Sequence, residues 1–237
     1  MSDTLQITPR LWQLKMGNVN AYLLKVADGL ALIDAGWPDK ADLIEERVRE
    51  AGHDPADIRH LVLTHGHIDH AGSAAEMRRR TGARVYAHAA DLDLITNGEA
   101  EHPGTTVTPG IMPHLLDLIF IKPGGTKYEA LPVDQALADG EALPMAPDVE
   151  VIHSPGHSAG HIALLLKPEG VLIAGDICSH VLGLGYSILN EDRALARQSI
   201  LRVAEYSFDQ AVFGHGSPLK PHANQVLKEK FQDAAPE

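Results

Sequence analysis

The stretch THGHIDHAG, residues 64–72, places His65, His67, Asp69 and His70 within six consecutive positions. The apolar run before it, residues 58–63, is typical of a buried strand. In an extended segment His65 and His67 face the same way, whereas Asp69 and His70 fall where the chain turns into the next helix. Asp69 alone could serve as a helix N-cap. The cluster as a whole indicates one turn that supplies ligands to two neighbouring metal ions.

Three later strand ends repeat the pattern of a polar ligand beside glycine. His157 lies in SPGHSAGH (154–161), Asp176 in LIAGDI (172–177) and His215 in VFGHGSP (212–218). A single histidine of this kind is more often a capping or core residue. Because strand ends in α/β proteins project side chains into a crevice, the repetition predicts that these residues join the first cluster in one site.

The composition narrows the class of protein. The 237 residues suit one large domain with a sizeable core. A net charge of -12 argues against nucleic acid and against an anionic membrane surface as partners. The single cysteine, Cys178, excludes an internal disulfide and fits a reducing compartment. With no signal-peptide pattern at the start and no apolar run near the ~18 residues of a membrane span, we expect a cytoplasmic protein that acts on a small molecule. A homodimer is the working hypothesis for its assembly.

Hydrophobic periodicity predicts strands and helices along the whole chain. The expected strands are 19–26, 30–34, 58–63, 83–89, 149–153, 161–167, 171–174 and one that begins near 210. The expected helices are 38–52, 69–82, 192–206 and 221–232. Residues 97–128 are rich in Gly and Pro and are predicted to be a lid or loop insertion with at most one short helix. The prediction is one α/β domain, 1–237, built from two sheet-and-helix halves.

The order HxHxDH, His, Asp, His resembles the metallo-β-lactamase superfamily over nearly the whole chain. The resemblance implies a four-layer αββα sandwich and two divalent metal ions, with Zn²⁺ expected and Fe or Mn as alternatives. It assigns His65, His67 and His157 to one metal, Asp69, His70 and His215 to the other, and Asp176 as the bridge. The motifs are specific for fold and metal binding and weak for substrate.

The implied chemistry is hydrolysis. A metal-bound hydroxide would attack an ester, thioester or lactone carbonyl, with Asp176 bridging the metals and Asp69 orienting the nucleophile or carrying its proton. Some relatives instead use one iron to oxidise persulfides, with the same ligand types. A non-catalytic metal sensor is a further alternative. The complete second ligand set favours the binuclear hydrolase.

Two apolar segments are candidates for the substrate pocket. Met112, Leu116 and Phe120 belong to the expected lid, and Leu182 and Tyr186 follow Asp176. These side chains either face the metals, which would suit an acyl chain or another uncharged body, or pack onto the core. Lactonase relatives carry a tyrosine three residues after the bridging Asp, where this chain has Ser179. The substrate therefore stays open.

Other reactive side chains are expected to be structural. His161, at the end of the 154–161 turn, is predicted to make a hydrogen bond rather than to bind metal. His60 and His153 are expected to be core or edge residues, and Cys178 to be a small buried side chain.

Overall fold

Two β-sheets face each other at the centre of the protein. The computed structural model describes residues 3–233, except that the side chain of Phe120 lies outside the described part. The first sheet has seven strands in the order β1 (Thr4–Thr8), β2 (Leu11–Lys15), β3 (Asn20–Val26), β4 (Gly29–Ile33), β5 (Ile58–Val62), β6 (Arg84–His88) and β8 (Gln135–Leu137). The second has five strands in the order β16 (Gln210–Val212), β12 (Val171–Ile173), β11 (Ile162–Leu166), β10 (Ala146–His153) and β9 (Ala142–Leu143).

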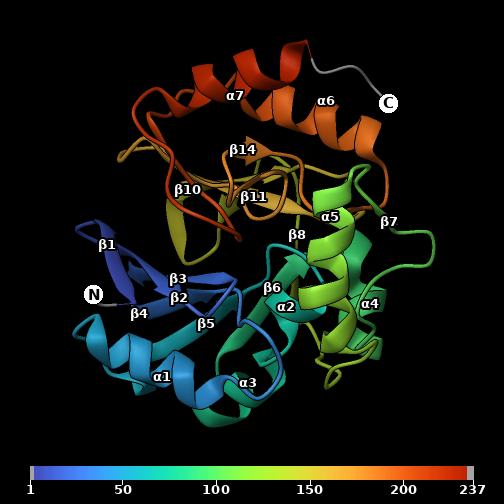
Figure 1. Cartoon of the computed structure of the whole chain (residues 1–237). Helices are drawn as coiled ribbons and strands as arrows, with labels where there is room; N and C mark the ends of the chain where they lie inside the picture. The colour runs from blue at the N-terminus through green and yellow to red at the C-terminus, as the bar shows by residue number, and fades with distance from the viewer. Residues whose placement is uncertain (1–2, 234–237) are drawn as a thin grey trace.

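Helices cover the outer face of each sheet, so the molecule has four layers (Figure 1). On the first sheet lie α1 (Ala41–Glu50) and α3 (Ala74–Thr81), and on the second lie α6 (Arg193–Val203) and α7 (Ala223–Gln232). Strand β3 shows how the sequence builds the layers. Leu23 packs in the core with α1 and α3, whereas Tyr22 and Leu24 point into the core between the sheets. The predicted αββα sandwich is confirmed.

Strand direction brings the candidate ligands to one edge. Strands β10 and β11 are antiparallel, β11 and β12 are antiparallel, and β12 and β16 are parallel. Strands β10, β12 and β16 therefore run the same way, and the turns that follow them meet at one edge of the second sheet. Residues 64–67 follow β5 of the first sheet, and α2 (Ile68–Ala71) begins immediately afterwards.

Several elements differ from the predictions. The helix expected over 69–82 is two helices, α2 and α3, separated at Gly72 and Ser73, where the Ser73 backbone leaves the helical range with φ -99° and ψ 7°. Strands β1 and β2 and helix α4 (Leu92–Asn97) were not predicted. Pro9 lies between the two strands, and α4 has only six residues, fewer than two helical turns.

The segment 97–128 has more local structure than expected. It contains β7 (Thr106–Val107), α5 (Ile111–Leu116), a π-helical turn (Asp117–Ile121) and a 3-10 turn (Lys122–Gly124). Strand β7 pairs with β15 (Leu189–Asn190), so this segment contacts the one that follows Asp176. A short hairpin of β13 (Ser179–His180) and β14 (Leu184–Gly185) lies between Asp176 and β15. Within residues 3–233, no helix has the length and apolar character needed to cross a membrane.

Candidate metal centre

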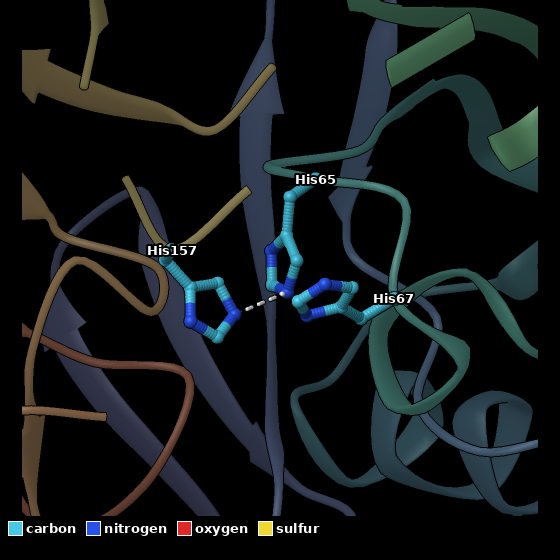
Figure 2. A group of neighbouring side chains, drawn as sticks. All are labelled: His65, His67 and His157. Carbon is cyan, nitrogen blue, oxygen red and sulfur yellow. Dashed lines mark hydrogen bonds between the residues drawn. The ribbon is translucent and has the colours of Figure 1, made fainter. Parts of the chain in front are cut away.

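Three histidines from both sheets converge on one point. His65 and His67 lie in the loop after β5, and His157 lies in the turn after β10. Figure 2 shows their rings directed toward one another. The His65 and His157 Nε2 atoms are 3.1 Å apart, and one ligand atom from each of the three residues lies within 4.8 Å of the others. All three side chains are buried, so this first group could hold a metal ion through nitrogen atoms alone.

A second group lies beside the first. The His215 Nε2 atom lies 3.1 Å from Asp69 Oδ2, and the His70 Nε2 atom lies 3.8 Å from the same oxygen. The ligand atoms of Asp69, His70 and His215 also lie within 4.8 Å of one another. This set combines one carboxylate with two imidazoles, which also suits a divalent transition metal.

The Asp176 carboxylate lies between the two groups. Its Oδ2 atom is 3.2 Å from His215 Nε2 and 3.8 Å from His157 Nε2, and its Oδ1 atom is 3.5 Å from His70 Nε2. One carboxylate therefore faces residues of both groups, as a bridging ligand would.

The donor set suits a cation because several of its atoms have no other partner. His67 Nε2, His70 Nε2 and Asp176 Oδ1 are buried without a hydrogen bond. A buried polar atom left unpaired costs about 1–3 kcal/mol. Three such atoms in one small volume are explained by an ion that all of them contact. The residues present therefore fit the divalent metals that the fold implies.

Asp34 sets the orientation of His70 and supports His65. The His70 Nδ1 atom donates to Asp34 Oδ2 at 2.9 Å, which leaves the Nε2 lone pair free for a metal. The Thr64 hydroxyl donates to the same oxygen at 2.8 Å, and Thr64 Oγ1 lies 3.0 Å from His65 Nδ1. Asp34 follows β4 in LALIDAG. This is the same strand-end signal as at Asp176, and sequence reasoning missed it.

Backbone carbonyls orient two further histidines in the same way. The His157 Nδ1 atom donates to the Leu189 carbonyl at 2.8 Å, and the His215 Nδ1 atom donates to the Asn18 carbonyl at 2.7 Å. In each ring the Nε2 atom is then left to face the centre.

Burial and neighbouring charges shift the histidine pKa values of the two groups in opposite directions. Burial lowers the pKa of His65 and His67 well below the usual histidine value, so both are neutral donors. Burial also acts to lower the pKa of His70, but Asp176, Asp69 and Asp34 outweigh it and raise that pKa to about 9. Burial opposes ionisation of Asp69, yet His70 and His215 hold its pKa at about 2. A cation at the second group would replace protons on its imidazoles.

Asp91 links the two loops that carry the first group, and sequence reasoning missed it. It is fully buried and accepts hydrogen bonds from the Gly66 N–H at 2.9 Å, the Ser158 hydroxyl at 2.7 Å and the Gly160 N–H at 2.5 Å. Gly66 separates His65 from His67, and Ser158 follows His157. The residues next to Asp91 in the sequence form no pattern that would predict this role.

The histidines expected to be structural have partners outside the two groups. The His161 Nε2 atom accepts a hydrogen bond from the Asp176 backbone N–H at 2.9 Å, and its Nδ1 atom lies 2.9 Å from Ser154 Oγ. The hydrogen-bonding role predicted for His161 is confirmed. His60 is buried between Tyr86 and Asp28, and Cys178 is buried as expected.

A cavity of about 1180 Å³ opens onto the centre. The candidate ligands that line it are His67, Asp69, His157, Asp176 and His215. Four of the five predicted substrate residues line it as well, namely Met112, Leu116, Leu182 and Tyr186. The fifth, Phe120, has its side chain outside the described residues. These apolar side chains thus share a cavity with the ligands, and their contact with substrate stays a prediction.

The four-layer fold and the paired His/Asp groups are those of a metal-dependent hydrolase family, and comparison with known proteins identifies that family. The chain belongs to the metallo-beta-lactamase superfamily, whose sequence model matches residues 14–215. It is 26% identical over 217 residues to "Probable metallo-hydrolase YflN" of Bacillus subtilis (strain 168), covering 84% of this chain and 81% of that one. It is 25% identical over 198 residues to "Atrochrysone carboxyl ACP thioesterase" of Aspergillus terreus, covering 79% of this chain and 48% of that relative.

A solved structure supports the same assignment. The metallo-beta-lactamase family protein TTHA1429 from Thermus thermophilus superposes with a TM-score of 0.70 at 26% identity, covering 96% of this chain and 81% of that one. The protein is thus a hydrolase of the metallo-beta-lactamase superfamily, with His and Asp groups that could bind divalent metal ions.

Proposed function

We propose that the protein is a binuclear metal-dependent hydrolase that cleaves an ester, thioester or lactone carbonyl. The observation that carries the proposal is the Asp176 carboxylate, which lies within 3.8 Å of imidazoles from both groups. His65, His67 and His157 would hold one ion, and Asp69, His70 and His215 would hold the other. We propose zinc as the metal, because imidazole and carboxylate are among its usual ligands.

The chain's residues have separate tasks in this proposal. When bound, the ions would lower the pKa of water from 15.7 to about 7 and polarise a carbonyl oxygen. Asp69 stays ionised because its pKa is held near 2, and it lines the cavity. Its carboxylate can therefore accept a hydrogen bond from the attacking water and orient it, whereas so low a pKa makes it a weak acceptor of the proton itself. Asp176 would connect the two groups, since its two carboxylate oxygens lie near imidazoles of both.

Two further facts support the carbonyl substrate. One relative is named as a thioesterase, and a thioester is one of the three bonds proposed. The net charge of -12 disfavours a nucleic acid or another polyanion, so we propose a small molecule as the substrate.

Elemental mass spectrometry of the purified protein and of Asp176→Ala tests the proposal. We expect about two zinc ions per chain, fewer in the variant, and hydrolysis of lactone or thioester substrates by the wild type only. Asp57→Ala serves as the control, because Asp57 is exposed and precedes β5, at the end of that strand opposite to the ligand loop. About one iron per chain would favour persulfide oxidation instead. No metal after growth with zinc, iron and manganese would overturn the proposal.

A further inference from the structure

The cavity beside the metal centre is larger than the reacting bond requires. Its volume of about 1180 Å³ is above the ~300–1,000 Å³ typical of pockets for drug-sized ligands. A simple lactone ring or a short ester would occupy a small part of it. The cavity therefore has room for a sizeable body beyond the reacting carbonyl group.

One wall of the cavity comes from α5 and the turn that follows it. Met112 and Leu116 are four residues apart, so they lie on the same face of the helix, and both line the cavity. Ile121 continues this wall at the end of the π-helical turn. Ile111 and Leu115, also four residues apart, are exposed on the same helix and are not among the lining residues.

A second wall comes from the segment after Asp176. Val181, Leu182 and Tyr186 line the cavity there. Leu182 is 77% exposed and Val181 is 54% exposed, and Met112 of the first wall is 49% exposed. Large apolar side chains gathered at the mouth of a cavity mark a surface that an apolar ligand covers. Strands β7 and β15 tie the two walls together.

The charged groups near these walls neutralise one another. Lys122 Nζ lies 3.4 Å from Asp117 Oδ2, and His102 pairs with Glu191. Glu101 also lines the cavity, and burial together with Asp117 raises its pKa. Paired cations and an additional carboxylate give an anionic body no favourable contact on these walls, and their apolar side chains suit an uncharged one.

We propose that these walls form a subsite for the straight apolar acyl chain of the substrate, longer than about four carbons. The inference rests on the proposed function, since it places the scissile carbonyl at the metal centre. Each methylene that is fully buried raises affinity by up to about fourfold. The protein thus selects acyl esters or thioesters by the length of the acyl chain rather than by a charged group on the substrate.

The test compares 4-nitrophenyl butanoate with 4-nitrophenyl octanoate. We expect kcat/KM of the metal-loaded wild type to be at least about tenfold higher for the octanoate. Met112→Asn and Leu116→Asn should each lower the octanoate-to-butanoate ratio by about threefold or more. Ile111→Asn and Leu115→Asn introduce the same polar group on the outward face of the same helix and should leave the ratio unchanged.

Binding of octanamide and butanamide, measured by calorimetry, separates this inference from the proposed function. These amides carry the same chains without an ester bond. If neither ester is hydrolysed, ester hydrolysis is wrong, but tighter binding of octanamide that weakens in Leu116→Asn still supports the subsite. Equal ratios for the two chain lengths, or an equal loss in the inward and outward variants, would overturn the subsite even in an active enzyme.

Discussion

Asp91 connects the two loops that carry the first ligand group. Its two oxygens accept three hydrogen bonds from two loops, and those loops carry His65, His67 and His157. A carboxylate can accept all three bonds at once because it has only acceptor sites. Any replacement with fewer acceptors leaves buried donors unpaired.

Asp91→Asn should therefore weaken both the fold and the first group. The amide nitrogen would face an N–H or O–H donor, so we expect a loss of about 2 kcal/mol in the free energy of unfolding. Supporting residues of this kind typically change metal affinity by about tenfold or more. Urea unfolding and zinc titration measure the two effects. Asp93→Asn, an exposed carboxylate two residues away, is the matched control, and equal behaviour of the two variants would contradict the role of Asp91.

Cys178 should be unreactive in the folded protein. It is fully buried, and burial, together with Asp176, raises the pKa of its thiol well above the usual cysteine value. Because the thiolate is the reactive form, we expect no labelling by an aromatic disulfide reagent at pH 8 until denaturant is added, and then one thiol per chain. Rapid labelling without denaturant would show that the site opens locally.

The sequence was most informative for residues that lie in marked turns. His157, Asp176 and His215 each follow an apolar strand and stand beside glycine, so their positions could be predicted. Asp91 could not be predicted in this way. Its donors are 25, 67 and 69 residues away in the chain, and no local periodicity reports contacts over such separations.

Among the elements, the turn from β10 into the His157 loop is held against α6. At Gly156 the backbone has a φ of +127°, and a Cβ atom there would come within 2.1 Å of the Ala196 backbone nitrogen. Both observations require glycine, because a side chain would meet the helix backbone and the dihedral is one that other residues rarely adopt. The approach of α6 thereby restricts the backbone of the turn that leads to His157.

Gly156→Ala should destabilise the protein and displace His157. The positive φ costs about 1 kcal/mol, and relief of the contact with α6 adds about 2 kcal/mol. Gly140→Ala provides the control, because Gly140 also has a positive φ, +75°, but has open space around its Cβ position. Thermal unfolding of both variants should show a clearly larger loss for Gly156→Ala. Equal losses would mean that the dihedral alone matters.

At the scale of elements, long periodic segments were predicted well and short ones were not. The strands near 20–26, 29–33 and 58–62 and helices α1, α6 and α7 matched their hydrophobic patterns. Helix α4 has six residues, fewer than two helical turns, and strands β7 to β9 have only two or three residues each. Whether such short elements form depends on pairing with distant parts of the chain, such as that of β7 with β15.

For the whole molecule, the proposed ions would act as cross-links between two halves. His65, His67, Asp69 and His70 follow β5 of the first sheet, whereas His157, Asp176 and His215 follow strands of the second. Each ligand group thus draws on both sheets. Ions held in this way stabilise only the folded arrangement, since the unfolded chain does not hold the ligands together.

Chelation should consequently lower the melting temperature as well as activity. At free metal one hundred times above Kd, each site contributes about 2.7 kcal/mol. A domain of this size changes its Tm by about 2–4 °C per kcal/mol, so complete demetallation should lower Tm by about 10 °C or more. Calorimetry before and after dialysis against a chelator measures the change, and added zinc should reverse it. An unchanged Tm after verified metal removal would contradict the cross-link.

The division of the ligands between the sheets also imposes an order on biosynthesis. Residues 65–70 leave the ribosome well before residues 157, 176 and 215. A nascent chain that has folded only its first sheet offers neither ligand group complete. Tight capture of the proposed ions would therefore have to wait until the second half of the chain has been made and has docked, which would make metal uptake a late stage of maturation.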